Sequence, residues 1–193
     1  GDVFQVAANG AAVTISKEGG QPDNITASNI EEVKIVGKAG DDVFSVVGNV
    51  AALTHLTIDG GAGNDTIRGG NGNDLLIGGD GNDIIDGNQG NDTALMGAGN
   101  DVFTWDPGDG NDIVDGGTGQ DRLEFNGSNA SEIMNISANG THAVLARNIA
   151  NITMDLDNVE HIKIRALGGT DQITVDDLRD TDVKLVTVDL NGS

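Results

Sequence analysis

Between residues 60 and 124 the chain places one apolar residue at intervals of nine positions, with a single interval of eleven, and fills the gaps mainly with glycine, asparagine and aspartate. One apolar residue between two neighbours of variable character predicts a very short strand with a single inward side chain. The glycine- and asparagine-rich residues before each strand tolerate positive φ and predict a turn. The predicted inward positions are Ile67, Leu76, Ile85, Ala94, Phe103, Val114 and Leu123.

One turn and one short strand reverse the chain once, so two nonapeptides predict one complete coil of eighteen residues. Successive coils are expected to stack at about 4.7–4.9 Å, which is the spacing of strands in a sheet. The inward residues would then form a thin core. The pattern therefore predicts an all-β fold, a right-handed parallel β-roll over residues 59–125.

The segments on either side alternate apolar and polar positions, and they are similar to each other. The stretch "SNIEEVKIVGKAGDDVFSV" (28–46) aligns with "DNVEHIKIRALGGTDQITV" (157–175) at a constant offset of 129 residues. Alternation of this kind predicts half-buried strands. We expect residues 1–58 and 126–193 to be two copies of one β-rich module that continue the roll and cover its open edges. The opening "GDVFQV" repeats the end of "GDDVFSV", which indicates a piece cut from a longer protein with more such modules.

Each nonapeptide also carries an aspartate at its sixth position. One coil of eighteen residues would stack Asp65 with Asp83 on one edge of the roll, and Asp74 with Asp92 on another. Stacked carboxylates a few ångströms apart cannot all stay ionised without a counter-charge. Ca²⁺ takes about six to eight oxygens from carboxylates and backbone carbonyls together, and glycine leaves the carbonyls free to face the ion. The pattern predicts calcium at Asp65, Asp74, Asp83, Asp92, Asp101, Asp112 and Asp121.

Shortened echoes of the nonapeptide stand in the flanks, where "GDDVFSV" and "GGTDQITV" place Asp42 and Asp171 at the acidic position. Neither aspartate has an in-phase partner eighteen residues away. Whether these two residues bind calcium therefore stays open at the level of the sequence.

Composition narrows the range of partners and activities. The formal net charge of −21, from 31 acidic and 10 basic residues, argues against nucleic acid and anionic membranes, because both need clustered lysine or arginine. Cysteine is absent, so thiolate metal sites are excluded, and no apolar run is long enough to span a bilayer. The histidines, His55, His142 and His161, are scattered, and neither H-E-x-x-H nor G-x-S-x-G occurs. We therefore expect a monomeric, non-catalytic chain, with Trp105 capping the end of the core.

The seven copies resemble the repeats-in-toxin (RTX) family of haemolysin-type calcium-binding repeats, whose signature is G-G-x-G-x-D-x-U-x with U apolar. The resemblance implies that one turn gives the carbonyls of its second and fourth residues and its aspartate. The turn one coil later gives the carbonyls of its first and third residues and its aspartate. Carried over, the first site would use Gly61, Gly63 and Asp65 with Gly78, Asp80 and Asp83; the second Gly70, Gly72 and Asp74 with Gly87, Gln89 and Asp92; the third Gly79, Gly81 and Asp83 with Met96, Ala98 and Asp101.

The match weakens after residue 104, where Trp105 and Asp106 are inserted and the spacing of the aspartates becomes twenty residues. If these two residues bulge outward, two further sites survive, giving three to five calcium ions in all. The fourth repeat, with Asn88 and Ala94, is expected to be the loosest coil. The fourth site would use Asn88, Gly90 and Asp92 with Pro107, Asp109 and Asp112, and the fifth Gly97, Gly99 and Asp101 with Gly116, Thr118 and Asp121.

Two functions follow from the resemblance. In the first, the chain is a calcium-binding structural segment of a large secreted or surface bacterial protein, exported unfolded by type I secretion and folded by extracellular calcium. In the second, it is the non-catalytic carrier of a secreted protease, lipase or epimerase. An EF-hand is excluded, because it needs a twelve-residue loop ending in glutamate between two helices. A flat ligand-binding face is a weaker alternative, because the third positions lack a threonine row: they are Ala62, Asn71, Asp80, Gln89, Ala98, Asp109 and Thr118.

Overall fold

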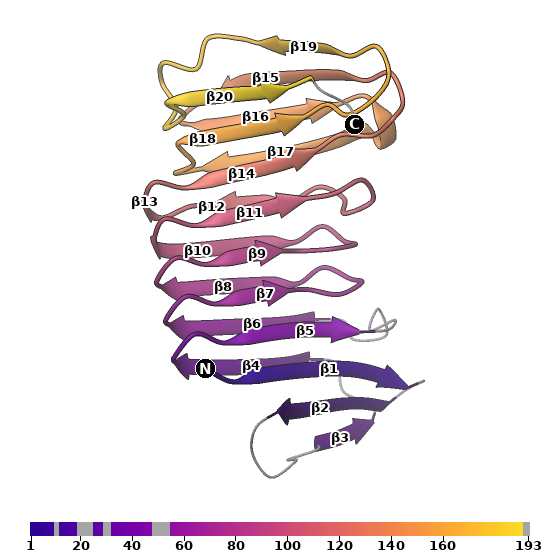
Figure 1. Cartoon of the computed structure of the whole chain (residues 1–193), viewed down its shortest axis with the longest axis vertical. Helices are drawn as coiled ribbons and strands as arrows, with labels where there is room; N and C mark the ends of the chain where they lie inside the picture. The colour runs from indigo at the N-terminus through magenta and orange to yellow at the C-terminus, as the bar shows by residue number, and fades with distance from the viewer. Residues whose placement is uncertain (10–11, 19–24, 29–31, 48–54, 191–193) are drawn as a thin grey trace.

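The computed structural model describes residues 1–9, 12–18, 25–28, 32–47 and 55–190. The chain winds into a stack of coils that runs from the N-terminal end to the C-terminal end of the molecule (Figure 1). Two ten-stranded sheets form the two faces of this stack. No helix in the described ranges is long and apolar enough to cross a membrane.

The first sheet forms one face of the roll. Its order is β20-β18-β14-β11-β9-β7-β5-β1-β2-β3. These strands are β20 (Leu185–Asp189), β18 (His161–Arg165), β14 (Arg122–Asn126), β11 (Val102–Trp105), β9 (Ile84–Asp86), β7 (Thr66–Arg68), β5 (Val43–Val47), β1 (Val3–Asn9), β2 (Ala12–Glu18) and β3 (Ile25–Ser28).

The second sheet lies on the opposite face, in the order β19-β15-β16-β17-β12-β10-β8-β6-β4, with β13 beside β10. A 3₁₀ turn, η1 (Ile149–Asn151), precedes β17. The strands are β19 (Gln172–Val175), β15 (Ile133–Asn139), β16 (His142–Arg147), β17 (Ile152–Asp157), β12 (Ile113–Asp115), β10 (Thr93–Gly99), β8 (Leu75–Asp80), β6 (His55–Ala62), β4 (Glu32–Ala39) and β13 (Thr118–Gly119).

The register of the central strands confirms the coil of eighteen residues. Ile67 pairs with Ile85, and Ile85 with Phe103, always in parallel. On the other face Leu76 pairs with Ala94. The strands β7, β9 and β12 have the three residues that the pattern predicts, whereas β8 and β10 are longer because the backbone of their turns pairs as well.

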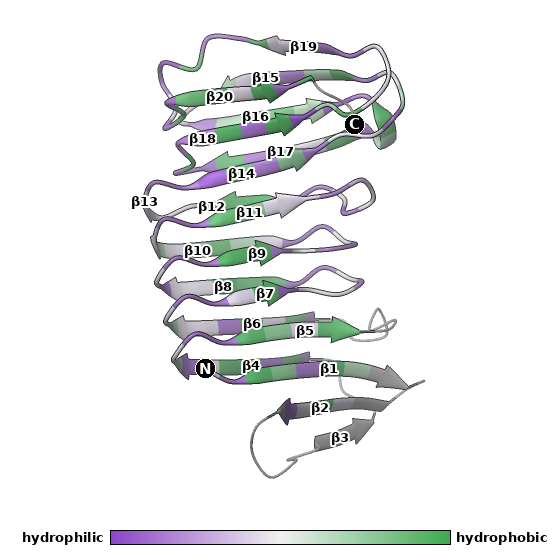
Figure 2. Cartoon of the chain, viewed as in Figure 1, coloured by the Kyte–Doolittle hydropathy of each residue, from purple (hydrophilic) through white to green (hydrophobic). Residues whose placement is uncertain are grey.

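The core consists of apolar side chains that both sheets direct into the space between them. All seven predicted inward residues are fully buried: Ile67, Leu76, Ile85, Ala94, Phe103, Val114 and Leu123. Figure 2 shows the hydrophobic residues along the strands and the hydrophilic residues in the turns between them. Each fully buried aliphatic side chain contributes about 1.5–3 kcal/mol. Apart from Met96 and the inserted Trp105, the repeats bury one apolar residue in each nonapeptide, so their core is thin.

Trp105 does not cap the end of the core, so that expectation is wrong, and it does not bulge outward, which was the condition for the fourth and fifth sites. It belongs to β11, pairs with Phe125 of the next coil and is fully buried. The two rings stack with centroids 4.1 Å apart, and the indole Nε1 donates a hydrogen bond to the carbonyl of Gly110 at 2.9 Å. The insertion lengthens the strand to a second inward position, and Asp106 begins the exposed turn that follows. The period of two in a strand explains why adding two residues keeps the register.

The two flanks contain the same pairing pattern. In the first, β1, β2 and β3 form an antiparallel meander, and β1 also pairs in parallel with β5. In the second, β15, β16 and β17 form such a meander, and β15 pairs in parallel with β19. The first meander lies in the first sheet and the second meander in the second sheet, whereas β4 of the first flank lies in the second sheet and β18 and β20 of the second flank lie in the first (Figure 1). The antiparallel meanders differ from the simple parallel rungs that the alternation predicts.

Candidate metal centre

The aspartates at the sixth positions line two edges of the roll, where the turns lead into the strands. Asp65, Asp83, Asp101 and Asp121 precede strands of the first sheet and define what we call the first edge. Asp74, Asp92 and Asp112 precede strands of the second sheet and define the second edge. All seven are buried, which is unusual for carboxylates that have no cationic side chain beside them.

Each aspartate is held by the coil before it. The backbone N–H of Asp65 donates to Oδ1 of Asp83 at 2.7 Å, and the N–H of Asp83 donates to Oδ1 of Asp101 at 2.7 Å. The same bond joins the pairs across the insertion, Asp92 to Asp112 and Asp101 to Asp121, at 2.8 Å each. The structure therefore brings together the aspartate pairs of all five predicted sites.

The second oxygen of these carboxylates is left without a partner. Oδ2 is buried and accepts no hydrogen bond in Asp65, Asp83, Asp92, Asp101, Asp112 and Asp121. A buried polar atom without a partner costs about 1–3 kcal/mol, and more when it is charged. Asp74 is the exception, because its Oδ2 accepts the N–H of Gly70 at 3.0 Å. A row of unpaired, buried carboxylate oxygens fits a bound cation.

A glycine at the first position of the turn leaves space beside the unpaired oxygen in four of these turns, those of Asp65, Asp83, Asp92 and Asp121. A Cβ added to Gly60 would lie 2.3 Å from Oδ2 of Asp65 and 2.7 Å from the carbonyl oxygen of Gly78. A Cβ added to Gly78 would lie 2.4 Å both from Oδ2 of Asp83 and from the carbonyl oxygen of Met96. The missing side chain therefore leaves a cradle between an aspartate and the first carbonyl of the next coil.

The other carbonyls of the turns face the same gap between coils. The carbonyl oxygens of Gly61 and Gly63 point to the next turn, 1.9 and 1.8 Å from where a Cβ of Gly79 and of Gly81 would stand. In the opposite direction, the carbonyl of Asp80 accepts the N–H of Gly63 at 2.7 Å. Carbonyl and carboxylate oxygens are the ligands that Ca²⁺ prefers.

The predicted sets differ in how completely the structure assembles them. The first and third sets have the arrangement described above. The turn that closes the second set has Asn88, a member of the fourth set, where other turns have a second glycine. Asn88 has φ of +58°, and its Nδ2 donates to the carbonyl of Gly69 at 3.2 Å. The carbonyls of Gly72 and Gln89 still face the gap there, because a Cβ of Gly90 would lie 1.8 Å from the first and the N–H of Gly72 donates to the second at 2.7 Å.

The last two sets are irregular. In the fourth, the structure does not bring Pro107 to the cradle at Gly87, where Oδ2 of Asp92 is the nearest atom; Pro107 lies in the exposed turn after β11. In the fifth, Met96 has a Cβ where other turns have glycine, and the carbonyl of Gly116 accepts the N–H of Gly97 at 3.2 Å. Both sets keep their paired aspartates. In the fifth set the carbonyl oxygens of Gly97 and Gly99 still face the next turn, 2.0 and 1.5 Å from where a Cβ of Gly117 and of Gly119 would stand.

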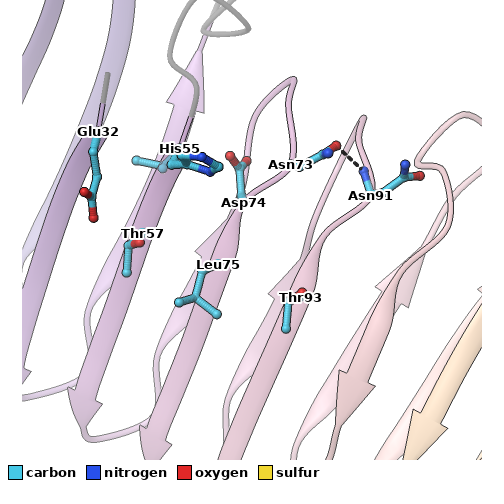
Figure 3. Close-up of a pocket in the computed structure, with 9 residues that line it drawn as sticks. Glu32, His55, Thr57, Asn73, Asp74, Leu75, Asn91 and Thr93 are labelled. Atoms are coloured by element: carbon cyan, nitrogen blue, oxygen red, sulfur yellow. Dashed lines mark hydrogen bonds between the residues drawn. The ribbon is translucent and has the colours of Figure 1, made fainter. Parts of the chain in front are cut away.

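An outer ladder of amide side chains runs beside the aspartates. The N–H of Asn82 donates to Oδ1 of Asn64 at 2.8 Å, and the N–H of Asn100 donates to Oδ1 of Asn82 at 2.7 Å. On the second edge the N–H of Asn91 donates to Oδ1 of Asn73 at 2.9 Å, in the hollow next to Asp74 (Figure 3). These bonds run in the opposite direction to those of the aspartates, so each turn is tied to both of its neighbours.

Two acidic residues that the sequence did not place in the array join the first edge. The N–H of Asp42 donates to Oδ1 of Asp65 at 2.7 Å, and the N–H of Asp121 donates to Oε2 of Glu160 at 2.8 Å. Asp171 also has a partner in register, because its Oδ1 accepts the N–H of Glu132 at 2.9 Å. The eighteen-residue period of the repeats does not predict these partners. The signal for Asp42 was the glycine, glycine and aspartate of "GKAGDD" at the first, fourth and sixth positions.

Burial makes the ionised form of these aspartates unfavourable. It raises the pKa of Asp92 to about 8, against the hydrogen bond from Asp74 and together with the charges of Asp112, Asp74 and Asp109. Burial likewise raises the pKa of Asp112 to about 7. Burial is also the main reason that the pKa of Asp83 is raised to about 6, with Asp101 and Asp65 adding to it. No group of three or more His, Cys, Asp or Glu side chains gathers in the described part of the chain, so a cation here would depend on two carboxylates and on carbonyls.

These pKa values predict how pH changes the stability of the folded chain in the absence of calcium. The pKa of a free aspartate is about 3.9, so the folded state binds more protons than the unfolded state between about pH 4 and pH 8. Stability in chelator is therefore greatest below about pH 4 and is lost as pH rises through about 6 to 8. Circular dichroism in chelator should show β-structure appearing on acidification. Saturating calcium should reverse the trend, and a β signal in chelator that grows with rising pH would contradict this prediction.

Comparison with known families agrees with the geometry. A family model described as the RTX calcium-binding nonapeptide repeat matches residues 59–94, 68–103 and 108–127, with four copies. No curated protein matches the chain.

Proposed function

We propose, from the premise that residues 59–127 consist of RTX calcium-binding nonapeptide repeats, that this chain is a structural segment of a secreted or surface bacterial protein and that calcium folds it after export. In the cytosol, where free calcium is low, the chain stays extended. Outside the cell, calcium fills the two edges and the coils close around the ions.

One observation carries the proposal. Six aspartates of the repeats are buried with Oδ2 unpaired, and in the complete turns a glycine leaves space between that oxygen and the carbonyls of the next coil. The oxygens belong to a donor set of carboxylates and backbone carbonyls, which suits a hard cation of adaptable geometry. When bound, calcium supplies positive charge to carboxylates that otherwise repel one another.

The residues proposed to hold the ions are those of the five sets given above. The first, second and third sets are the better sites. The fourth and fifth are weaker, because Pro107 lies outside the cradle and Met96 carries a side chain at the first position. Asp83, Asp92 and Asp101 each belong to two sets, so neighbouring ions share a ligand and should bind cooperatively.

Calcium should stabilise the chain where magnesium does not. Mg²⁺ requires nearly octahedral geometry at about 2.0–2.1 Å and keeps its water, so it fits poorly between two flexible turns. Extracellular calcium modules have dissociation constants of about 10⁻⁴ to 10⁻³ M. We expect millimolar Ca²⁺, and not millimolar Mg²⁺, to raise the melting temperature, with a Hill coefficient above one in the calcium titration.

Differential scanning calorimetry and isothermal titration in the two metals provide the measurement. Equal stabilisation by magnesium would refute the calcium-specific donor set. Submicromolar affinity for calcium would refute folding after export, because the sites would then fill inside the cell.

A further inference from the structure

The turn that precedes β5, residues 37–42, lies before the segment that the family model matches. Its sequence, "GKAGDD", has glycine at the first and fourth positions and aspartate at the sixth. In the sheets Lys38 pairs with Gly61 and Val43 pairs with Thr66. The turn therefore sits one coil before the first nonapeptide turn, although it is 23 residues away along the chain.

The aspartate of this turn is placed like those of the repeats. Asp42 is 1% exposed, its N–H donates to Oδ1 of Asp65, and its Oδ2 is buried without a partner. A Cβ added to Gly37 would lie 2.4 Å both from Oδ2 of Asp42 and from the carbonyl oxygen of Gly60. The cradle at Gly78, in the third set of the repeats, has the same two distances.

The carbonyls of the turn also face the gap between this turn and the turn of residues 60–65. The carbonyl oxygen of Lys38 is 2.2 Å from where a Cβ of Gly61 would stand, and that of Gly40 is 2.3 Å from where a Cβ of Gly63 would stand. In return, the carbonyl of Ala62 accepts the N–H of Gly40 at 2.7 Å. The gap thus has the same six oxygen donors as the first and third sets.

Lys38 in this turn adopts a backbone conformation that is unfavourable for a residue with a side chain. Lys38 has φ of +82°, close to the +107° of Gly61, which occupies the same position one coil later. A residue with a side chain rarely adopts this conformation and holds it only where its surroundings determine it. Here the conformation directs the second carbonyl of the turn into the gap.

We propose that this gap is a further calcium site, which the carbonyls of Lys38 and Gly40 and the carboxylate of Asp42 form together with the carbonyls of Gly60 and Ala62 and the carboxylate of Asp65. The proposal rests on the proposed function and extends it beyond the repeats. Asp65 becomes a ligand shared by two ions, and one ion joins the N-terminal flank to the roll.

Native mass spectrometry of the calcium-loaded full chain tests the site by counting ions. Asp42→Asn keeps an oxygen to accept the N–H of Asp2, which Oδ1 of Asp42 accepts at 2.6 Å, and it should hold one ion fewer than the unmodified chain. The control is Asp41→Asn, which removes the same charge from the neighbouring exposed residue and should hold the full number. A full number of ions in Asp42→Asn would overturn the proposal.

Further variants separate this proposal from the general one. If the unmodified chain binds no calcium, the proposed function fails. If Asp83→Asn loses ions and Asp42→Asn does not, the repeats bind calcium and only this site is refuted. Should circular dichroism show that Asp42→Asn does not fold in saturating calcium, Asp65→Asn decides: a loss of two ions supports the site, and a loss of one refutes it.

Discussion

Removing calcium with excess chelator near neutral pH is expected to unfold the chain almost completely and to abolish its β-rich circular dichroism spectrum. The seven aspartates with a buried, unpaired Oδ2, Asp42 included, would together cost about 7–21 kcal/mol at about 1–3 kcal/mol each. The whole stability of a typical domain is only about 5–15 kcal/mol. The penalty is therefore as large as the net stability of a typical domain, and a formal charge of −21 opposes compaction further.

Calcium reverses this balance, because binding to the folded state alone contributes directly to folding free energy. The measurement is far-ultraviolet circular dichroism during a calcium titration, followed by chelator to show that folding is reversible. Matched ionic strength from sodium chloride is the control for simple screening of charge. A β-rich spectrum that survives excess chelator at neutral pH would refute the dependence on calcium.

Asp83→Asn is expected to lower stability in saturating calcium about twice as much as Asp121→Asn. Asp83 belongs to two of the proposed sites and Asp121 to one. The two residues are otherwise well matched: each is buried, each accepts an N–H through Oδ1, and burial raises the pKa of each to about 6. At a free calcium concentration ten times the dissociation constant, one bound ion contributes about 1.4 kcal/mol to the free energy of unfolding. The expected loss is therefore about 3 kcal/mol for Asp83→Asn and at most about 1.4 kcal/mol for Asp121→Asn.

Urea denaturation of the calcium-saturated proteins measures these losses. In chelator at about pH 7 the sign should change, because asparagine removes a carboxylate that burial makes unfavourable in the absence of the ion. Equal losses for the two variants would contradict the sharing of Asp83 between ions. A loss in chelator as large as in calcium would show that Asp83 acts through the fold alone.

The sequence was enough to predict the coil and the paired aspartates, because a fixed period leaves one way to stack the turns. The inward position of Ile85 and the bond between Asp65 and Asp83 both follow from the repeat of eighteen residues. The expected place of Trp105 at the end of the core is wrong, because the repeat does not determine the direction of two inserted residues. Their direction depends on the neighbouring coil, where the ring of Phe125 stacks on Trp105.

The sequence does not decide whether Asp42 binds calcium, for a related reason. Its partner in the array, Asp65, is 23 residues away, so a search in phase does not find it, and only the pairing of β4 with β6 and of β5 with β7 places the two turns one above the other. The antiparallel meanders of the flanks were also missed, because alternation of apolar residues predicts a strand and says nothing about the direction of its neighbour.

The two ladders of opposite direction have a consequence for how such a chain can change its length. The coils depart from eighteen residues at the insertion at Trp105, between Asp42 and Asp65, and between Asp121 and Glu160. The first two departures leave the six-residue turns intact. A residue added within a turn would break bonds to the coils on both sides, and a single residue added within a strand would turn its inward side chain outward. Insertions and deletions should therefore be tolerated where a strand ends and the next turn begins, as at Trp105, and there the roll can carry grafted loops or guest peptides at a regular axial spacing.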